Sequence, residues 1–223
     1  MNETSSGRAS DFWEAMAVSG AIQTRSLAGG QALFRQGQVV SHLYRLESGR
    51  VRLVRQTENG TAVLVHLARP GETFAEASAF AATYHCDAFA DVSSRVAVMP
   101  KAVLLTALAH DPDTSLRFAR LLAGQVVELR ARIELRNIRS ARERLLAWLR
   151  LHAKGNMLQV DLDGTWSDVA AEIGMTREAL YRALARLATD GDIERAGSTV
   201  LLLSCAANGR SSGTSSTTAR SMC

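Results

Sequence analysis

The 223-residue chain lacks the features of membrane and secreted proteins. It has no apolar run of about 18 residues, the length that a membrane-spanning helix needs, and Met1–Phe12 has no apolar core of the signal-peptide type. Its three cysteines, Cys86, Cys205 and Cys223, are widely spaced and odd in number, which fits a reducing cytoplasm and not a disulfide framework. We therefore expect a cytoplasmic protein with no membrane partner.

The chain also lacks the residue patterns of an enzyme or a metal site. It contains no P-loop, no nucleophile elbow and no HExxH motif, so we expect no enzyme. His42, His66, His110 and His152 do not have the spacing of metal ligands. We expect no metal site and no cofactor, while a small-molecule effector of unknown identity stays open.

Net charge gives only weak guidance about partners. A net charge of +4 permits a nucleic-acid partner without requiring one. Between Arg139 and Leu203 basic and acidic residues balance, with nine of each. Any argument for DNA binding therefore depends on where individual arginines lie, and not on bulk charge.

One stretch, TWSDVAAEIGMTREALYRALARL (165–187), has the pattern of a helix-turn-helix. Thr165 and Asp168 form a capping box that begins a first short helix, and Gly174 supplies the left-handed turn after it. Thr176 can cap a second helix. The apolar positions of this second helix keep helical spacing: Ala179, Leu180, Ala183, Leu184 and Leu187.

Four side chains near the start of the second helix face outward: Arg177, Glu178, Tyr181 and Arg182. A recognition helix places this end against base edges in the major groove, where Arg pairs with guanine O6 and N7 and Glu accepts from cytosine N4. We expect these four residues to read bases. Four others are expected to contact the DNA backbone: Thr165, Ser167, Thr176 and Arg195. The alternative is an ordinary helical hairpin with solvated arginines.

Two predicted strands after the second helix strengthen the DNA-binding interpretation, because such a wing commonly accompanies this motif. The predicted order is a helix end at Asp190-Gly191-Asp192, a strand over Ile193–Arg195, a turn at Ala196–Ser198 and a strand over Thr199–Leu203. We assign residues 138–204 to a winged helix-turn-helix domain. Its first helix, Ala141–Ala153, begins with a capping box of Ser140 and Glu143. The Ser/Thr/Gly-rich stretch 205–223 is predicted to be a disordered tail.

The N-terminal half has the pattern of a small β-barrel or roll. Short β-like runs separated by turn residues cover 32–34, 43–46, 51–55, 61–68, 88–92 and 96–99. Asn59-Gly60 gives a strong hairpin signal between two of them. We assign residues 21–110 to this sensor roll and residues 1–20 to a variable, polar lead-in.

A long helix is predicted over 111–137, starting at Asp111-Pro112. Apolar residues recur along it at spacings of 3, 4, 3 and 4: Ala119, Leu122, Val126, Leu129 and Ile133. This heptad seam predicts a homodimer, because helix-turn-helix proteins usually read paired half-sites with two-fold symmetry. The alternative is that this short seam packs against its own domain.

The order of a β-roll, a long dimerisation helix and a winged helix-turn-helix, an α+β architecture, resembles the Crp/Fnr family of bacterial transcription regulators. In the roll the resemblance is carried by GGQALFRQGQ (29–38), LYRLESGRVRLVRQTENG (43–60) and RPGETFAEAS (69–78). It implies a cyclic-nucleotide-binding-like sensor roll, coupled through the central helix to domains that contact promoter DNA and RNA polymerase. Arg177, Glu178 and Arg182 fall on the family's base-reading positions, which implies half-sites related to TGTGA or TTGA. Tyr181 stands where the family often has a small residue.

The sensor half departs from the resemblance where a cyclic nucleotide would bind. The family's nucleotide binders present Gly-Glu to the ribose and Arg-Ser to the cyclic phosphate, whereas this chain has Ala75-Glu76 and Cys86-Asp87. A carboxylate in place of a cation repels phosphate, so we expect no activation by cyclic AMP. The family's Thr-Ser pair on the central helix is also missing from Val126–Arg130, where Arg130 is the nearest replacement cation. No cysteine precedes Cys86, so an N-terminal iron–sulfur cluster is not expected.

Tyr84-His85-Cys86-Asp87 is the unusual feature of the roll. A thiol beside an imidazole can act as a low-pKa redox switch or a haem ligand, but a single cysteine is more often a small buried hydrophobe. The residues of the candidate effector pocket are Glu76, His85, Cys86, Asp87 and Arg130. Redox or haem sensing, and effector-independent architectural DNA binding, stay open as alternatives.

Overall fold

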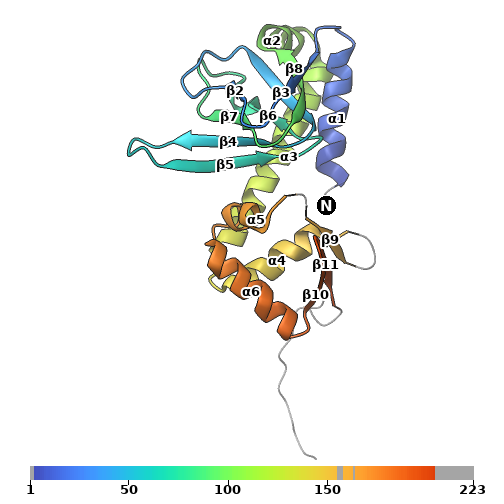
Figure 1. Cartoon of the computed structure of the whole chain (residues 1–223). Helices are drawn as coiled ribbons and strands as arrows, with labels where there is room; N and C mark the ends of the chain where they lie inside the picture. The colour runs from blue at the N-terminus through green and yellow to red at the C-terminus, as the bar shows by residue number, and fades with distance from the viewer. Residues whose placement is uncertain (1–2, 155–157, 163, 204–223) are drawn as a thin grey trace, which may run out of the picture.

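The computed structural model describes residues 3–154, 158–162 and 164–203. A β-rich N-terminal unit lies at one end of the molecule and a smaller, mainly helical C-terminal unit at the other, with one long helix running between them (Figure 1). This is the predicted α+β architecture. The predicted tail, 205–223, lies outside the described residues. Within the described part, no helix is both long and apolar enough to cross a membrane.

Two four-stranded antiparallel sheets form the roll. The first has the order β1 (Gln23–Leu27), β8 (Ser94–Pro100), β3 (His42–Ser48), β6 (Thr73–Phe74), and the second the order β2 (Ala32–Phe34), β7 (Asp87–Ala90), β4 (Val51–Gln56), β5 (Ala62–Ala68). Strands β4 and β5 make the hairpin that Asn59-Gly60 predicts. Gly60 has a φ of 75°, and its amide donates to the Thr57 carbonyl at 2.9 Å.

The N-terminal residues form a helix where the sequence pattern predicts only a polar lead-in. Helix α1 (Glu3–Ala17) buries Phe12, Trp13 and Met16, and the Trp13 indole nitrogen donates to Thr73 Oγ1 at 2.8 Å. The buried side chains keep helical spacing, but the polar first half of the helix masks that signal. The segment assigned to a variable, polar lead-in thus contributes a helix to the core.

Helix α2 (Lys101–His110) leads into the long helix α3 (Pro112–Asn137). Asp111 caps α3, since its Oδ1 accepts from the Asp113 amide at 3.0 Å, and a proline in the first turn is compatible with the free helix start. The residues that α3 buries against its own chain form one stripe: Thr114, Phe118, Leu121, Gly124 and Leu135. This stripe is distinct from the predicted heptad seam.

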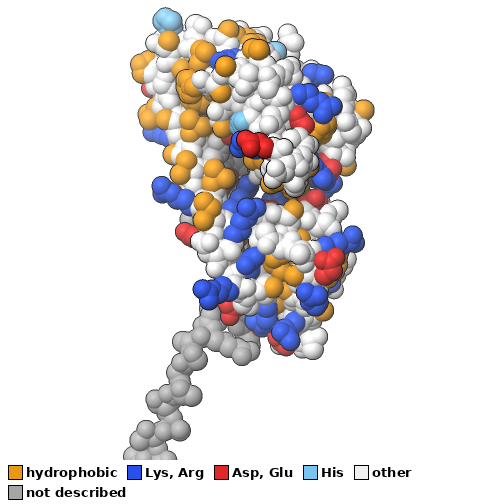
Figure 2. All heavy atoms as spheres, turned by 90° about the vertical axis from the view of Figure 1, so that its left-hand side faces the viewer, with side chains coloured by type: hydrophobic (Ala, Val, Ile, Leu, Met, Phe, Trp, Pro, Cys, Tyr) orange, Lys and Arg blue, Asp and Glu red, His pale blue; other side chains and the backbone are white. Residues whose placement is uncertain are grey.

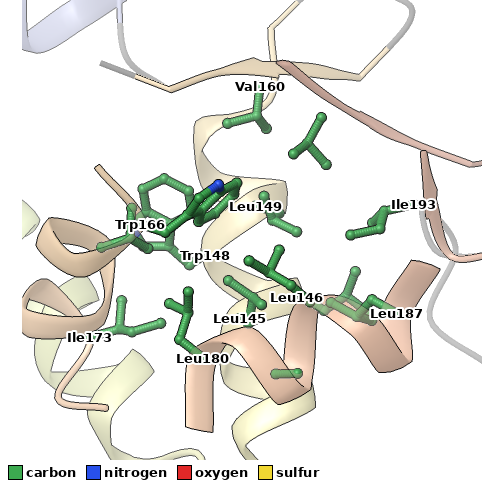
Figure 3. Close-up of a cluster of buried hydrophobic side chains, with 14 of the residues drawn as sticks. Leu145, Leu146, Trp148, Leu149, Val160, Trp166, Ile173, Leu180, Leu187 and Ile193 are labelled. Carbon is green, nitrogen blue, oxygen red and sulfur yellow. The ribbon is translucent and has the colours of Figure 1, made fainter. Parts of the chain in front are cut away.

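The C-terminal unit packs three helices against a small sheet. Its elements are α4 (Ala141–His152), β9 (Gln159–Asp161), α5 (Trp166–Glu172), α6 (Arg177–Thr189), β10 (Ile193–Ala196) and β11 (Thr199–Leu202), with sheet order β10-β11-β9. Figure 3 shows the core, in which Leu145 and Leu146 of α4 lie beside Leu180 and Leu187 of α6. The predicted wing strands are present, and β9 adds a third strand that the sequence pattern does not predict.

Candidate nucleic-acid interface

Three local features predicted from the sequence define the boundaries of α5 and α6: a cap at the start of each helix and a glycine turn between them. The Thr165 hydroxyl accepts from the Asp168 amide at 3.3 Å, and the Asp168 carboxylate accepts from the Thr165 amide at 2.9 Å, which completes the capping box. Gly174 has a φ of 65° between the helices, a conformation that glycine adopts without strain. The Thr176 hydroxyl then accepts from the Ala179 amide at 3.2 Å and begins α6. The predicted helix-turn-helix geometry is confirmed.

The four predicted base-reading residues are all exposed at the first two turns of α6: Arg177, Glu178, Tyr181 and Arg182. The opposite face of α6 is buried in the core of the unit. The Arg177 guanidinium carbon lies 5.6 Å from the centre of the Tyr181 ring, within cation–π range. Hydrogen bonds at the helix start, from its own backbone amide first and then with Thr176, lower the pKa of Glu178. Glu178 therefore presents an ionised acceptor beside two guanidinium donors.

The four predicted backbone-contacting residues divide between two places. Thr176 is exposed beside the base-reading residues, at the start of α6. Thr165, Ser167 and Arg195 are exposed around the start of α5, where the Arg195 guanidinium lies 5.7 Å from the centre of the Trp166 ring. Figure 2, which views the side on which α6 lies, shows Lys and Arg side chains gathered over the lower unit. This surface has the charge that DNA phosphates require.

The heptad seam on α3 is open to solvent over most of its length. Val126, Leu129 and Ile133 are 46, 53 and 59% exposed, Ala119 is exposed, and Leu122 is half-buried beside the cluster that includes α1. In Figure 2, hydrophobic side chains are visible along the left-hand edge of the molecule. The alternative that the seam packs against its own domain is therefore wrong for its lower three positions. An apolar stripe of this kind favours a partner helix.

The interior of the roll contains stacked aromatic rings. The Phe34 and Tyr84 rings are stacked with centres 3.9 Å apart, and Tyr44 stacks on both Phe34 and Phe74 at about the same separation, 5.5 and 5.4 Å. The Tyr84 hydroxyl donates to the His42 carbonyl at 2.8 Å, so its polar end is also satisfied. These rings fix the space between the two sheets.

Glu76 begins the short 3₁₀ helix η1 (Glu76–Ser78) inside the roll. The preceding residue, Ala75, has a φ of 66°, a left-handed conformation that favours glycine. Burial raises the pKa of Glu76, and among the described residues its Oε2 has no hydrogen-bond partner. A buried carboxyl of this kind binds its proton more tightly than an exposed one.

The other predicted pocket residues divide between the interior and the surface of the roll. Cys86 is 1% exposed, and burial, then the charge of Asp87, raises the pKa of its thiol to about 11. Asp87 is buried, accepts from the Gln36 amide at 2.7 Å and lies 3.8 Å from Arg35 Nη1. His85 and Arg130 are both exposed on the outside. The burial and raised pKa of Cys86 fit the predicted small buried hydrophobe and argue against the alternative of a low-pKa redox switch.

Sequence reasoning missed the contact between the roll and α5. Arg50, just before β4, and Arg52 of β4 pair with Asp168 of α5, and both arginines also pair with Asp91 of the roll. Residues more than a hundred positions apart make this contact, so no local pattern announces it. The only local signal is the run of alternating arginines and apolar residues in β4.

Two family models match the chain: a cyclic nucleotide-binding domain over residues 24–111 and a Crp-like helix-turn-helix domain over residues 143–207. Together with the winged helix-turn-helix on the long central helix, they decide the family. The chain belongs to the Crp/Fnr family of transcription regulators. The resemblance that its sequence shows is confirmed.

The chain shares less than a third of its aligned residues with each of the following Crp/Fnr-type relatives. The chain is 26% identical to the CRP-like cAMP-activated global transcriptional regulator of Mycobacterium tuberculosis over 190 residues (81% of this chain, 84% of the relative). It is 29% identical to the cyclic AMP receptor protein of Thermus thermophilus over 184 residues (80% and 83%). The structure of FixK2 from Bradyrhizobium japonicum shares the fold, with a TM-score of 0.68 at 19% identity (81% and 92% covered).

Proposed function

We propose that this Crp/Fnr-type regulator binds pseudo-palindromic promoter sites as a homodimer, in concert with RNA polymerase, and that it does so without cyclic AMP. The observation that carries DNA recognition is the exposed quartet Arg177, Glu178, Tyr181 and Arg182 at the start of α6. Their donors and acceptors match base edges in the major groove.

Base reading by the quartet follows from the chemistry of each side chain. Arg177 and Arg182 offer guanidinium forks for guanine O6 and N7, and Glu178 offers an acceptor for the cytosine amino group. The Tyr181 ring supports Arg177 from one side. We expect half-sites related to TGTGA or TTGA, and backbone contacts from Thr165, Ser167, Thr176 and Arg195.

Two-fold symmetry follows from the seam on α3. Pairing Val126, Leu129 and Ile133 with the same residues of a second copy removes exposed apolar surface from water. A dimer places two copies of α6 on one face of the DNA. Its half-site centres are then about one helical turn, roughly 10–11 bp, apart.

Cyclic AMP is not the effector in this proposal, although two relatives are named for it. A cyclic phosphate needs a cation, and the position that carries Arg in the family's nucleotide binders holds the buried Cys86 next to Asp87. The raised pKa of the Cys86 thiol also disfavours a thiolate redox switch. The effector, if one acts, has another chemistry.

Selection of bound fragments from random duplex DNA by the purified full chain tests this function. The proposal predicts an inverted repeat with the spacing given above and, by light scattering, a dimer at micromolar concentration. Enrichment of no sequence would overturn sequence-specific binding. A stable monomer that enriches single half-sites would overturn the homodimer.

A further inference from the structure

Arg144 of α4 joins the turn of the helix-turn-helix to the link that follows α3. Its Nη1 donates to the Ile173 and Gly174 carbonyls in that turn, at 3.3 and 3.0 Å. Its Nε and Nη2 both donate to the Ile138 carbonyl, directly after the end of α3, at 2.8 and 2.6 Å. One half-buried side chain therefore ties the turn before α6 to the end of the long helix.

Arg136, in the last turn of α3, contacts the same turn. Its Nε donates to the Glu172 carbonyl at 3.2 Å, and its Nη2 donates to the Ala171 carbonyl at 3.4 Å. A Cβ built on Gly174 would lie 3.5 Å from Arg136 Cγ, so the aliphatic stem of the arginine packs on the turn glycine. The carbonyls of residues 171–174 thus all accept from one or the other of two arginines.

The chain link and the apolar contact between α3 and the C-terminal unit specify nearness more than direction. Residues 138–140 connect α3 to α4, and Leu135 of α3 is buried in the core of the C-terminal unit. Apolar burial is non-directional. A guanidinium group, by contrast, is a rigid planar fork whose N–H groups point in fixed directions. The two arginines therefore supply an orientation that apolar burial alone does not.

The direction in which α6 is held relative to α3 matters for the proposed dimer. The long helix α3 runs from the roll to the C-terminal unit (Figure 1) and carries the exposed apolar heptad seam. When two copies pair along this seam, the distance and the angle between their α6 helices depend on how each α6 is fixed to its own α3. One base pair moves a half-site by about 3.4 Å and turns it by about 35° around the duplex, so a fixed attachment favours one spacing.

We propose that Arg144 and Arg136 are positioning residues that set the half-site spacing which the dimer binds. They act through the backbone of the turn that carries α6, and not through contact with a base. This role rests on the proposed homodimer and its binding to inverted repeats. It goes beyond that function, because it assigns spacing selectivity to two side chains outside the base-reading and backbone-contacting sets.

The test compares the binding of wild type and full-length Arg144→Gln to three inverted repeats and to a single half-site. The repeats carry the half-sites that wild type selects, at the selected spacing and with one base pair added or removed. Wild type should bind the selected spacing at least about tenfold more tightly than the other two, because the second contact is intramolecular only where both helices fit. Arg144→Gln should reduce this preference to about twofold to threefold, while its affinity for the single half-site stays within about twofold of wild type.

A purely structural role of Arg144 predicts a different pattern. Loss of folded or active protein lowers the affinity for all four duplexes by the same factor and leaves the spacing preference unchanged. That result would overturn the positioning role.

Two control variants separate geometry from charge. Arg139 is an exposed residue of the same link, so Arg139→Gln removes the same charge and should keep the wild-type spacing preference. Arg144→Lys keeps the charge without the planar fork and should broaden the preference as Arg144→Gln does. A full wild-type preference in Arg144→Lys would contradict the role of the fork.

Arg136→Gln keeps the test decisive if Arg144→Gln does not fold. Arg136 is exposed, so its replacement removes the bonds to the Glu172 and Ala171 carbonyls without opening the core. This variant should also broaden the spacing preference, and an unchanged preference would contradict the proposal. Failure of wild type to select any inverted repeat would overturn the proposed function and with it the spacing role. A wild-type repeat whose spacing preference persists in both variants would overturn the spacing role alone.

Discussion

The start of α6 and the roll differ in how their arginines are partnered. At the start of α6, Arg177 and Arg182 project into solvent with no carboxylate holding them in place within the described residues. In the roll, Arg35 pairs with Asp87 and Arg50 pairs with Asp91. An anion binds where a cation is available, so the start of α6 offers anion-binding chemistry that the paired Arg35 and Arg50 of the roll do not.

The comparison also concerns what is buried. The roll encloses a carboxyl and a thiol, Glu76 and Cys86, in their neutral-favouring environments, whereas the core of the C-terminal unit is apolar. A site for a cyclic phosphate requires a cation, whereas these buried groups of the roll are a carboxyl and a thiol. In the proposed function, α6 presents base-reading residues while the roll lacks the cation that a cyclic phosphate needs.

The largest effect is expected from a substitution in the heptad seam on α3. Leu129→Glu places a charge at the centre of the apolar stripe and should convert the dimer to a monomer. DNA affinity should fall by about a hundredfold or more, because the second half-site contact is no longer intramolecular. Light scattering and a binding titration measure both effects.

A control for the seam is available on the same helix. Val127 is 52% exposed on α3 but lies outside the seam positions, so Val127→Glu should leave the dimer intact. Equal disruption of the dimer by both variants would show that α3 tolerates no added charge, and would contradict a specific role of the seam residues in dimerisation.

Next in size is the loss of a base-reading arginine. Arg177→Ala should weaken binding to the selected site by about 1–3 kcal/mol and relax base preference at one position of the half-site. Arg186→Ala removes an exposed arginine from the last turn of the same helix and should leave base preference unchanged. The measurement is a repeat of the DNA selection with both variants. An unaltered binding motif for Arg177→Ala would contradict the placement of α6 in the major groove.

A smaller effect is expected at the cap of α5. Thr165→Ala removes the hydroxyl that accepts from the Asp168 amide, and should lower the free energy of unfolding by about 1 kcal/mol. Urea denaturation followed by circular dichroism measures this change. A stability equal to that of wild type would mean that tertiary packing alone places the helix.

The smallest expected effect is a pH dependence that originates in the roll. Burial raises the pKa of Glu76 in the folded chain above its ordinary value of 4.5, so the folded state holds this proton more tightly than the unfolded state does. The stabilisation is complete below about pH 4.5 and is lost as the pH rises through the raised pKa. Glu76→Gln should flatten this part of the stability profile and be more stable than wild type at pH 8. A profile identical to that of wild type would show that Glu76 is ionised without penalty.

Local signals account for what the sequence predicts well. Capping residues such as Thr165 and Thr176, and the turn residues Gly60 and Gly174, each act within four positions of the chain, so they can be read directly. The four outward residues of α6 follow from its apolar period. Their exposure is observed, whereas their contacts with DNA stay predictions.

Long-range contacts account for what the sequence does not predict. Helix α1 is stabilised by packing against α3 and by the bond from Trp13 to Thr73, 60 positions away. The raised pKa of Cys86 depends on its burial in the folded roll, which decides against the alternative of a reactive thiol and which no local pattern could decide. The pairing of Arg50 and Arg52 with Asp168 likewise has no local signature.

We propose above that this Crp/Fnr-family chain reads DNA without a cyclic nucleotide. The most direct test is calorimetric titration of cyclic AMP into the purified full-length protein, paired with the DNA affinity measured with and without the nucleotide. We expect no saturable binding heat and an unchanged DNA affinity. A dissociation constant of about 10 μM or tighter, roughly 7 kcal/mol of binding, together with tighter DNA binding, would contradict it.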